Sequence, residues 1–249
     1  MKQSRFTGLL LYAAMVLLLT SCGGSSNEKT TSSDSTATAD TASKAAVAVQ
    51  EKNTIVTSPQ NMMIVTHKVA DFAKWQMAYD EHDSMRLASG IHSYVIARGF
   101  QDSNMVMVAV KIDDVTKAKA FSKSPDLKKA MQKSGVTGAP SISIITATWQ
   151  DTATLSSNLR SRTTFSVKDW DAWVKGFEDG KQERMDNGIL DRVISHDVDD
   201  NKKVSIVTAV MDTAKAFTYY KSDALKKRRA ASGVISEPQR FLFRVVKRY

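Results

Sequence analysis

The sequence contains one cysteine, Cys22, among 249 residues. A single thiol cannot form a disulfide within the chain, and Cys22 lies in an N-terminal segment with the features of an export signal. We therefore expect no disulfide, no catalytic cysteine and no thiolate metal site in the folded part. A glycine-rich phosphate loop, a Ser-His-Asp order and paired carboxylates in an apolar setting are also missing. The sequence thus lacks the residue patterns by which several enzyme classes are recognised.

Long hydrophobic runs are missing too, since the N-terminal apolar run extends only from Leu9 to Leu19. It follows two basic residues and precedes small residues, which is the order of a secretory signal, and it is too short for a membrane span. The sequence Leu19-Thr-Ser-Cys22 resembles the bacterial lipobox, in which signal peptidase cuts before a cysteine that carries lipid. We expect a lipoprotein signal peptide at 1–21, lipidation of Cys22 and a lipid-anchored location in the bacterial cell envelope, in the periplasm or at the outer surface. The alternative is an ordinary signal peptide that happens to contain a cysteine.

Large apolar residues are scarce in the next segment, from Gly23 to about Gln60, which is rich in Ser, Thr, Ala and Asp. Such a segment cannot bury enough surface to offset its chain entropy. We expect the range 22–60 to consist of the lipidated cysteine and a disordered tether, which joins the folded part to the membrane. The remaining residues are numerous enough to build a double domain with its own core.

Negative charge is in short supply, because 35 lysines and arginines outnumber 26 aspartates and glutamates, for a net charge of +9. The excess gathers late in the chain, at Lys221, Lys226, Lys227, Arg228, Arg229, Arg240, Arg244, Lys247 and Arg248. These residues are either a solvated surface or a patch attracted to anionic lipid head groups or an acidic partner. Nucleic acid is not an expected partner, since no aromatic residues are interleaved to form a stacking platform.

The most informative stretch runs from Asp71 to Ile91 and is predicted to be one amphipathic helix. Asp71 is a good N-cap, Gly90 a good stop, and large side chains recur between them at steps of three and four. These side chains are Phe72, Trp75, Tyr79, His82 and Arg86. The pattern returns 98 positions later as Asp169, Trp170, Trp173, Phe177, Arg184 and Gly188. The chain is therefore a tandem repeat.

The order of predicted elements in each copy is strand, helix, strand, strand, helix, strand, which is the ferredoxin-like unit. The strands predicted for the first copy are 62–69, 91–100, 105–112 and 142–147. Each sheet would have one helix-covered face and one bare face, and the bare face must be buried against the other copy. We predict an α+β fold in which two tandem ferredoxin-like βαββαβ repeats form a fused pseudo-dimeric α+β barrel, as a monomer. The predicted boundaries are 61–149 for the first repeat, 150–160 for a linker and 161–249 for the second repeat.

Three motifs carry a resemblance to a known family. They are Thr-His-Lys-Val-x-Asp-Phe-x-x-Trp at 66–75, Tyr-Asp-Glu-His at 79–82 and Gly-Val-x-Gly-x-Pro at 135–140. Together they resemble the dimeric α+β barrel superfamily, and within it the antibiotic-biosynthesis-monooxygenase-like domains. The resemblance implies a barrel formed by two ferredoxin-like units, here fused in one chain. The superfamily includes cofactor-free oxygenases and haem-degrading enzymes, so the resemblance does not select one activity.

The candidate ligand-binding residues are His82, His67, Trp75, Tyr79 and Arg86. His82 shares the helix stripe with the two aromatic residues and is expected to face an apolar pocket between helix and sheet, near His67 at the end of the first strand. A buried His82 is either a core residue bonded to a backbone carbonyl or to Tyr79, or a general base or ligand contact.

Both histidines are absent from the second copy, where Phe165 and Gly180 take their places. We therefore expect one site-bearing repeat and one structural repeat. The histidines show no zinc-ligand spacing, so no metal is expected. No cofactor is expected either, although haem could use His82 or His67 as its axial ligand.

Three functions remain open. The favoured one is a cell-envelope lipoprotein that binds a small apolar or aromatic ligand in the first repeat. The second is a cofactor-independent monooxygenase-like enzyme that uses His67 and His82. The third is a structural or interaction module without a ligand site. No catalytic residue is assigned, because no complete catalytic set is present.

Overall fold

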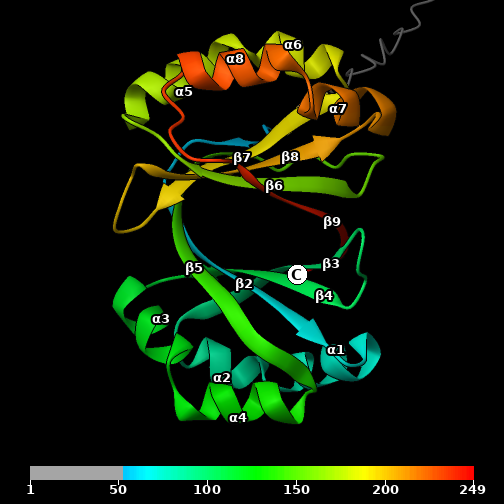
Figure 1. The fold of residues 1–249 in the computed structure, drawn as a ribbon. Helices are drawn as coiled ribbons and strands as arrows, with labels where there is room; N and C mark the ends of the chain where they lie inside the picture. Colours follow the sequence, from blue (N-terminus) through cyan, green and yellow to red (C-terminus); the bar gives the residue numbers. More distant parts are fainter. Residues whose placement is uncertain (1–52) are drawn as a thin grey trace, which may run out of the picture. The chain divides into compact units, whose positions relative to one another are not determined.

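The computed structural model describes residues 53–249 (Figure 1). The predicted signal peptide, the predicted lipidation at Cys22 and most of the predicted tether lie outside the described residues. The first strand, β1 (Ile55–Val56), pairs with the end of a later strand, with Ile55 opposite Asp151. Paired structure therefore begins inside the range 22–60 assigned to the tether. The reason is that this later strand runs past residue 150 and offers its edge to the two β-branched residues.

Each repeat follows the order βαββαβ, with every helical segment divided in two. The first repeat consists of β2 (Gln60–Val69), α1 (Phe72–Glu81), α2 (Asp83–Leu87), β3 (Ile91–Gly99), β4 (Met105–Ile112), α3 (Val115–Ser122), α4 (Pro125–Lys133) and β5 (Val136–Asp151). The second consists of β6 (Leu159–Ser166), α5 (Trp170–Asp179), α6 (Lys181–Asp186), β7 (Ile189–Asp197), β8 (Lys203–Val210), α7 (Thr213–Tyr220), α8 (Asp223–Ala231) and β9 (Gln239–Arg248).

Capping residues start the helices where the sequence predicts. The Asp71 carboxylate accepts a hydrogen bond from the backbone N–H of Lys74 at 2.9 Å, and so begins α1. The Ser124 hydroxyl accepts from the N–H of Leu127 at 3.2 Å, and Pro125 is the first residue of α4. Within residues 53–249, none of the helices is long and apolar enough to cross a membrane.

The single helix predicted for residues 71–90 is wrong, because the chain bends at His82. The backbone of His82 has φ −89° and ψ 17°, which ends α1 before α2 begins. Gly180 has φ −87° and ψ 4° at the same place between α5 and α6. The bend is therefore a property of both repeats. Gly180 therefore lies between two helices and not in a helix interior, where a glycine would lower stability.

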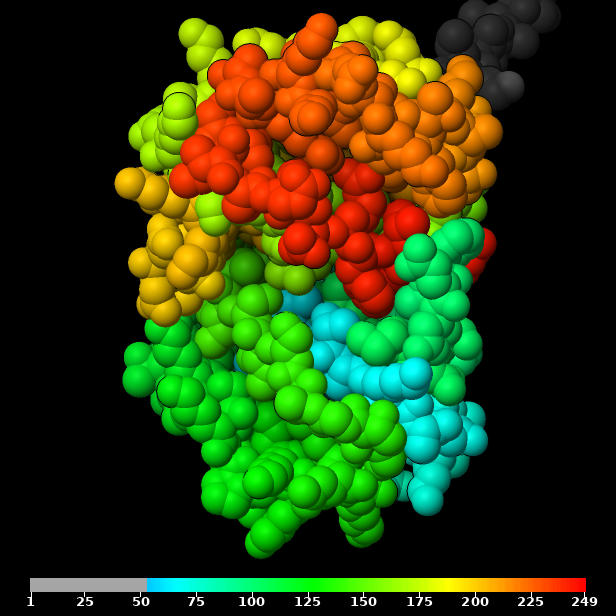
Figure 2. Space-filling model, in the orientation of Figure 1, coloured from blue at the N-terminus to red at the C-terminus, as the bar shows by residue number. Residues whose placement is uncertain are grey.

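Eight strands close into a barrel. The strand order is β5-β2-β4-β3 in the first repeat and β9-β6-β8-β7 in the second. The repeats then pair reciprocally: β3 joins β9, with Arg98 opposite Arg244, and β5 joins β7, with Ile145 opposite Asp197. Each repeat thus covers both sheet edges of the other, and the fused pseudo-dimeric α+β barrel is confirmed. Figure 2 shows the C-terminal segment, in red, lying against the first repeat.

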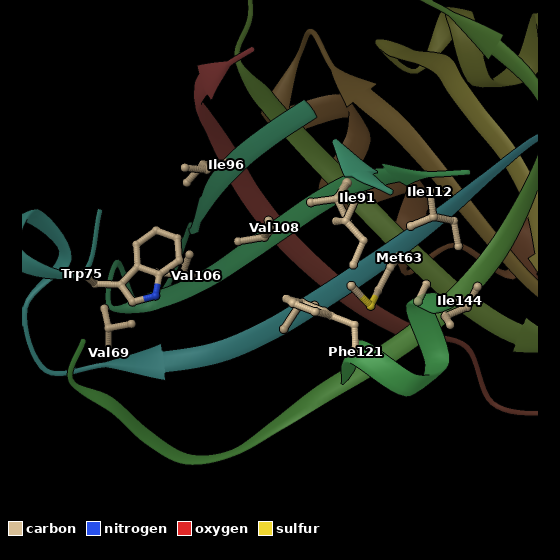
Figure 3. Packing of buried hydrophobic residues seen from close by; sticks show 13 residues of the cluster. Met63, Val69, Trp75, Ile91, Ile96, Val106, Val108, Ile112, Phe121 and Ile144 are labelled. Carbon is tan, nitrogen blue, oxygen red and sulfur yellow. The ribbon is translucent and has the colours of Figure 1, made fainter. Parts of the chain in front are cut away.

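Both faces of each sheet are covered. The helices α1–α4 lie on the outer face of the first repeat and α5–α8 on that of the second (Figure 1). Trp75 and Phe121 are buried under the first set, and Figure 3 shows them standing apart along the sheet with Val108 between them. The inner faces of the two sheets meet in the barrel, where Met62 packs in one cluster with Phe243.

Candidate functional site

One cavity in the first repeat collects all five predicted ligand-binding residues. His67, Trp75, Tyr79, His82 and Arg86 line it from β2, α1, α2 and the bend between the two helices. This cavity, called here the first-repeat cavity, has a volume of about 70 Å³, counted as the space open to the centre of a water-sized sphere. One water needs roughly 10–15 Å³ on this measure. The other lining side chains are apolar, with the exception of one serine, and include Met63, Met85, Val108, Phe121, Leu127 and Met131.

His67 is the polar group on the floor of this cavity. It is 4% exposed and packs on the Trp75 ring, with 5.3 Å between the ring centroids. Neither of its ring nitrogens has a hydrogen-bond partner among the residues that the structure describes. Burial lowers the pKa of His67 to about 4, so its ring is neutral at pH 7 and offers one N–H donor and one nitrogen acceptor. Leaving both unpaired costs stability, because buried polar groups are normally hydrogen-bonded.

His82 satisfies one ring nitrogen within the fold and keeps the other. Its Nδ1 lies 2.6 Å from the carbonyl oxygen of Ala78. A carbonyl only accepts, so Nδ1 carries the proton of this bond, and in the neutral ring Nε2 is then an acceptor. His82 is half-buried and lines the cavity as well. The two roles considered for His82, a residue bonded to a backbone carbonyl and a ligand contact, are therefore compatible in one geometry.

Arg86 and Tyr79 hold the helix bend together. The Arg86 guanidinium lies over the Tyr79 ring, 3.7 Å from its centroid. It donates to the Tyr79 carbonyl at 2.7 Å and to Asp83 at 2.9 Å. The Tyr79 hydroxyl is hydrogen-bonded to Ser93 at 2.9 Å, and burial raises the pKa of Tyr79, so the phenol is protonated at neutral pH. Arg184 repeats the arrangement in the second repeat, over the Phe177 ring. Arg86 thus stabilises the bend and also lines the cavity, and its Nε has no hydrogen-bond partner among the described residues.

His92 lies apart from this cavity, on the exposed side of β3, where its Nε2 is 2.9 Å from Asp113. Three or more His, Cys, Asp or Glu side chains do not gather anywhere in residues 53–249 in a way that could hold a metal ion.

The second repeat has a matching cavity of different chemistry. Its lining includes Trp173, Phe177 and Arg184, which correspond to Trp75, Tyr79 and Arg86. Its volume is about 60 Å³ on the same measure. A repeat expected to be only structural is therefore also hollow. Its lining adds three arginines and two tyrosines where the first repeat is mainly apolar: Arg228, Arg229, Arg240, Tyr219 and Tyr220.

Position 180 has a glycine where the first repeat has His82, and an arginine–glutamate ion pair lies beside this glycine. A Cβ on Gly180 would lie 3.0 Å from Cδ of Arg228. Arg228 donates to Glu183 there, so the pair occupies the space beside the bend. The equivalent first-repeat residues are Met85 and Ala130, which cannot form an ion pair and which line the first-repeat cavity together with His82. This exchange was not foreseen from the sequence, although aligning the two copies position by position would have revealed it.

The comparisons with known proteins identify the class of fold. No family model and no curated protein matches the chain. Among solved structures, an anthrone oxidase-like protein superposes with a TM-score of 0.53 at 14% identity, over 78% of this chain and 94% of that chain. A proposed monooxygenase from Fusobacterium nucleatum superposes with a TM-score of 0.50 at 11% identity, over 76% of this chain and 93% of that chain. A haem-binding protein from Thermus thermophilus gives a TM-score of 0.49 at 10% identity, over 78% and 94%.

The first two likenesses show that the chain is an α+β protein with the dimeric α+β barrel fold, built here from two repeats of one chain. At such low identity they show the fold, and the activity has to be argued from the site.

Haem does not fit the first-repeat cavity in this conformation. His67 and His82 each have a nitrogen that could ligate iron. The space of about 70 Å³ holds only a few water molecules, however, and a porphyrin is far larger. Arg86, the one cation in the lining, is already bonded to Asp83 and to the Tyr79 carbonyl.

Proposed function

We propose that the folded part binds a small apolar or aromatic molecule with one hydrogen-bonding group in the first-repeat cavity. The observation that carries the proposal is His67, a neutral, buried imidazole whose two nitrogens lack partners among the described residues, in a mainly apolar lining. A ligand hydroxyl or carbonyl that reached His67 would remove the penalty of the unpaired group. The ligand body would replace contacts that the empty space denies to the surrounding side chains.

A cavity of about 150 Å³ holds benzene, so the first-repeat cavity, at about 70 Å³, has to widen to take one aromatic ring. Trp75 and Tyr79 stack on one another, with ring centroids 5.3 Å apart, and form a flat wall. Met63, Met85 and Met131 contribute unbranched, polarizable side chains that adjust to a ligand with little strain. Such a wall favours binding through contact area, and His67 supplies the orientation.

The first test uses p-cresol and p-xylene, which have the same shape but differ by a hydroxyl in place of a methyl group. Wild-type protein is expected to prefer p-cresol. The variant His67→Phe, which introduces the residue found at position 165, is expected to lose between about twofold and tenfold in affinity for p-cresol, the worth of a neutral hydrogen bond. Its affinity for p-xylene should change little. Isothermal titration calorimetry measures all four combinations.

The same variant has a stability readout. Removing the unpaired imidazole should raise the free energy of unfolding by about 1–3 kcal/mol. Because the pKa of His67 is about 4 in the folded state and near 6.5 when unfolded, the wild type loses stability as the pH falls through this window, and the variant should lose less. Equal affinities of wild type and variant for p-cresol would contradict the role of His67. Consumption of dioxygen with p-cresol would instead favour the monooxygenase-like enzyme.

We further propose that lipid on Cys22 anchors this binding protein in the bacterial cell envelope. The segment Leu19-Thr-Ser-Cys22 is the basis of this part of the proposal. The variant Cys22→Ser should appear in the soluble fraction and lack the mass of the lipid, because a serine cannot form the thioether. Membrane fractionation and intact mass spectrometry of the full chain provide the test. Unchanged membrane retention of the serine variant would refute the anchor.

A further inference from the structure

A second and separate cavity lies inside the barrel, on the opposite face of the sheets from the helices. This barrel cavity has a volume of about 90 Å³ on the same measure as the first-repeat cavity. The two repeats line it with different chemistry. The first repeat contributes Met62 and Ile64 from β2, whereas the second contributes Arg160 and Arg162 from β6, at the positions 98 residues later.

The guanidinium groups of Arg160 and Arg162 have only neutral partners among residues 53–249. Arg160 is 4% exposed, and its Nη1 donates to the carbonyl of Ser157 at 2.8 Å and to that of Leu159 at 2.9 Å. Arg162 donates from Nε to the Ser205 hydroxyl at 3.0 Å and from Nη2 to a further serine hydroxyl at 3.1 Å. These bonds leave several N–H groups of the two guanidinium groups without a protein acceptor.

Two further arginines line the same cavity. Arg192 is 5% exposed and pairs with Asp151 at 2.7 Å, and Arg248 reaches the cavity from the end of β9. Asp151 is the one carboxylate in the described lining, so four positive charges are balanced by a single negative one. Burial lowers the pKa values of Arg160 and Arg162 to about 10, which still leaves both charged at neutral pH. Repulsion from Arg192 and Arg248 contributes to the low pKa of Arg160.

Buried cations without counter-charge are unfavourable unless an anion joins them. A guanidinium presents its N–H donors in a plane that matches a carboxylate, and Arg192 and Arg248 lie close enough to Arg160 to act on its charge. The lining side chains from β2 and β4, which include Met62, Ile64 and Met107, are apolar. The cavity therefore offers a charged end and an apolar end.

We propose that the barrel cavity binds a small organic carboxylate, whose charged group joins the cluster of lining arginines around Arg160 and whose apolar body contacts Met62 and Ile64. Exposed Thr152 and Arg248 belong to the lining and mark where a ligand enters. The site is independent of the first-repeat cavity, because β2 separates the two: His67 and Met63 face the helices, and Met62 and Ile64 face the barrel interior.

The test is titration of the protein with benzoate, and with benzamide as a neutral molecule of the same shape. Benzoate should bind, and its affinity should fall at least tenfold in Arg160→Gln and by a smaller factor in Arg162→Gln, which removes one positive charge from the lining. The matched control is Lys226→Gln, which removes one charge from exposed α8 and should bind benzoate like the wild type. Benzamide should bind at least tenfold more weakly than benzoate. Inorganic phosphate, which has no apolar body, should also bind more weakly.

Each alternative outcome overturns part of the proposal. No binding of benzoate to the wild type, or undiminished binding to both arginine variants, would refute the carboxylate site. Equal affinity for benzamide would refute the role of charge, and tighter binding of phosphate would refute the apolar end. A stability measurement accompanies the titration, since relief of unpaired charge predicts that both arginine variants melt no lower than the wild type in the absence of benzoate. The comparison with benzamide uses the wild type alone and does not depend on how the variants fold.

Discussion

Replacing Asp191 with alanine is expected to lower the free energy of unfolding by about 3–5 kcal/mol, the usual cost of leaving one partner of a buried ion pair behind. Asp191 accepts two hydrogen bonds from Arg184, at 2.8 and 2.6 Å, and the two side chains are only 8% and 9% exposed. Arg184 also donates to the Phe177 carbonyl at the bend between α5 and α6. Loss of Asp191 would leave a buried guanidinium with one neutral acceptor.

The first repeat provides a matched control for this prediction. Arg86 occupies the place of Arg184 but pairs with Asp83, whose side chain is 47% exposed and accepts at 2.9 Å. The variant Asp83→Ala should therefore cost less than about 1 kcal/mol, because water replaces an exposed carboxylate. Chemical denaturation of both variants measures the difference. Similar losses in the two repeats would show that burial of the pair does not set its contribution.

If the chain is cut between the repeats, neither half is expected to remain a stably folded monomer on its own. The cut removes the β3–β9 and β5–β7 pairings, which leaves two open edges and one bare inner face on each half. The inner face of the first repeat is apolar, with Met62 and Ile64, so this half should dimerise with itself or aggregate. The second half carries Arg160 and Arg162 at those positions, and a homodimer would place them against the same residues of its copy.

The halves should therefore behave differently when separated. We expect the first half to self-associate, the second half to resist homodimerisation because of charge repulsion, and a mixture of both to form a stable one-to-one complex. Size-exclusion chromatography with light scattering distinguishes these species. Two soluble, folded and monomeric halves would contradict the account of the barrel.

Much of the fold was predictable because local and long-range signals agree. Asp71 and Asp169 begin equivalent helices 98 residues apart, and the bare faces of two ferredoxin-like sheets leave a barrel as the natural solution. The bend at His82 could not be predicted, because the helical spacing of the side chains continues across it. The extent of β5 was underestimated for a similar reason: Gly138 and Pro140 suggest a turn, yet the strand runs from Val136 because pairing with β2 overrides that local preference.

The sequence predicted which residues line the candidate site, but not how their polar atoms are hydrogen-bonded. Helical spacing brought Trp75, Tyr79 and His82 together, and proximity of the first strand added His67. Neither ring nitrogen of His67 has a hydrogen-bond partner within residues 53–249, because the neighbouring elements place no donor or acceptor within reach. No sequence pattern shows this. Of the arginines in the barrel cavity, Arg248 belongs to the basic group recognised in the sequence, whereas no sequence pattern singles out Arg160, Arg162 or Arg192.

The most direct test of the central claim is a crystal structure of the wild-type protein with p-cresol. We predict that the p-cresol ring lies in the first-repeat cavity against Trp75 and that its hydroxyl is within hydrogen-bonding distance of a ring nitrogen of His67. A p-cresol molecule elsewhere on the protein, with the nitrogens of His67 still unpaired, would contradict the claim.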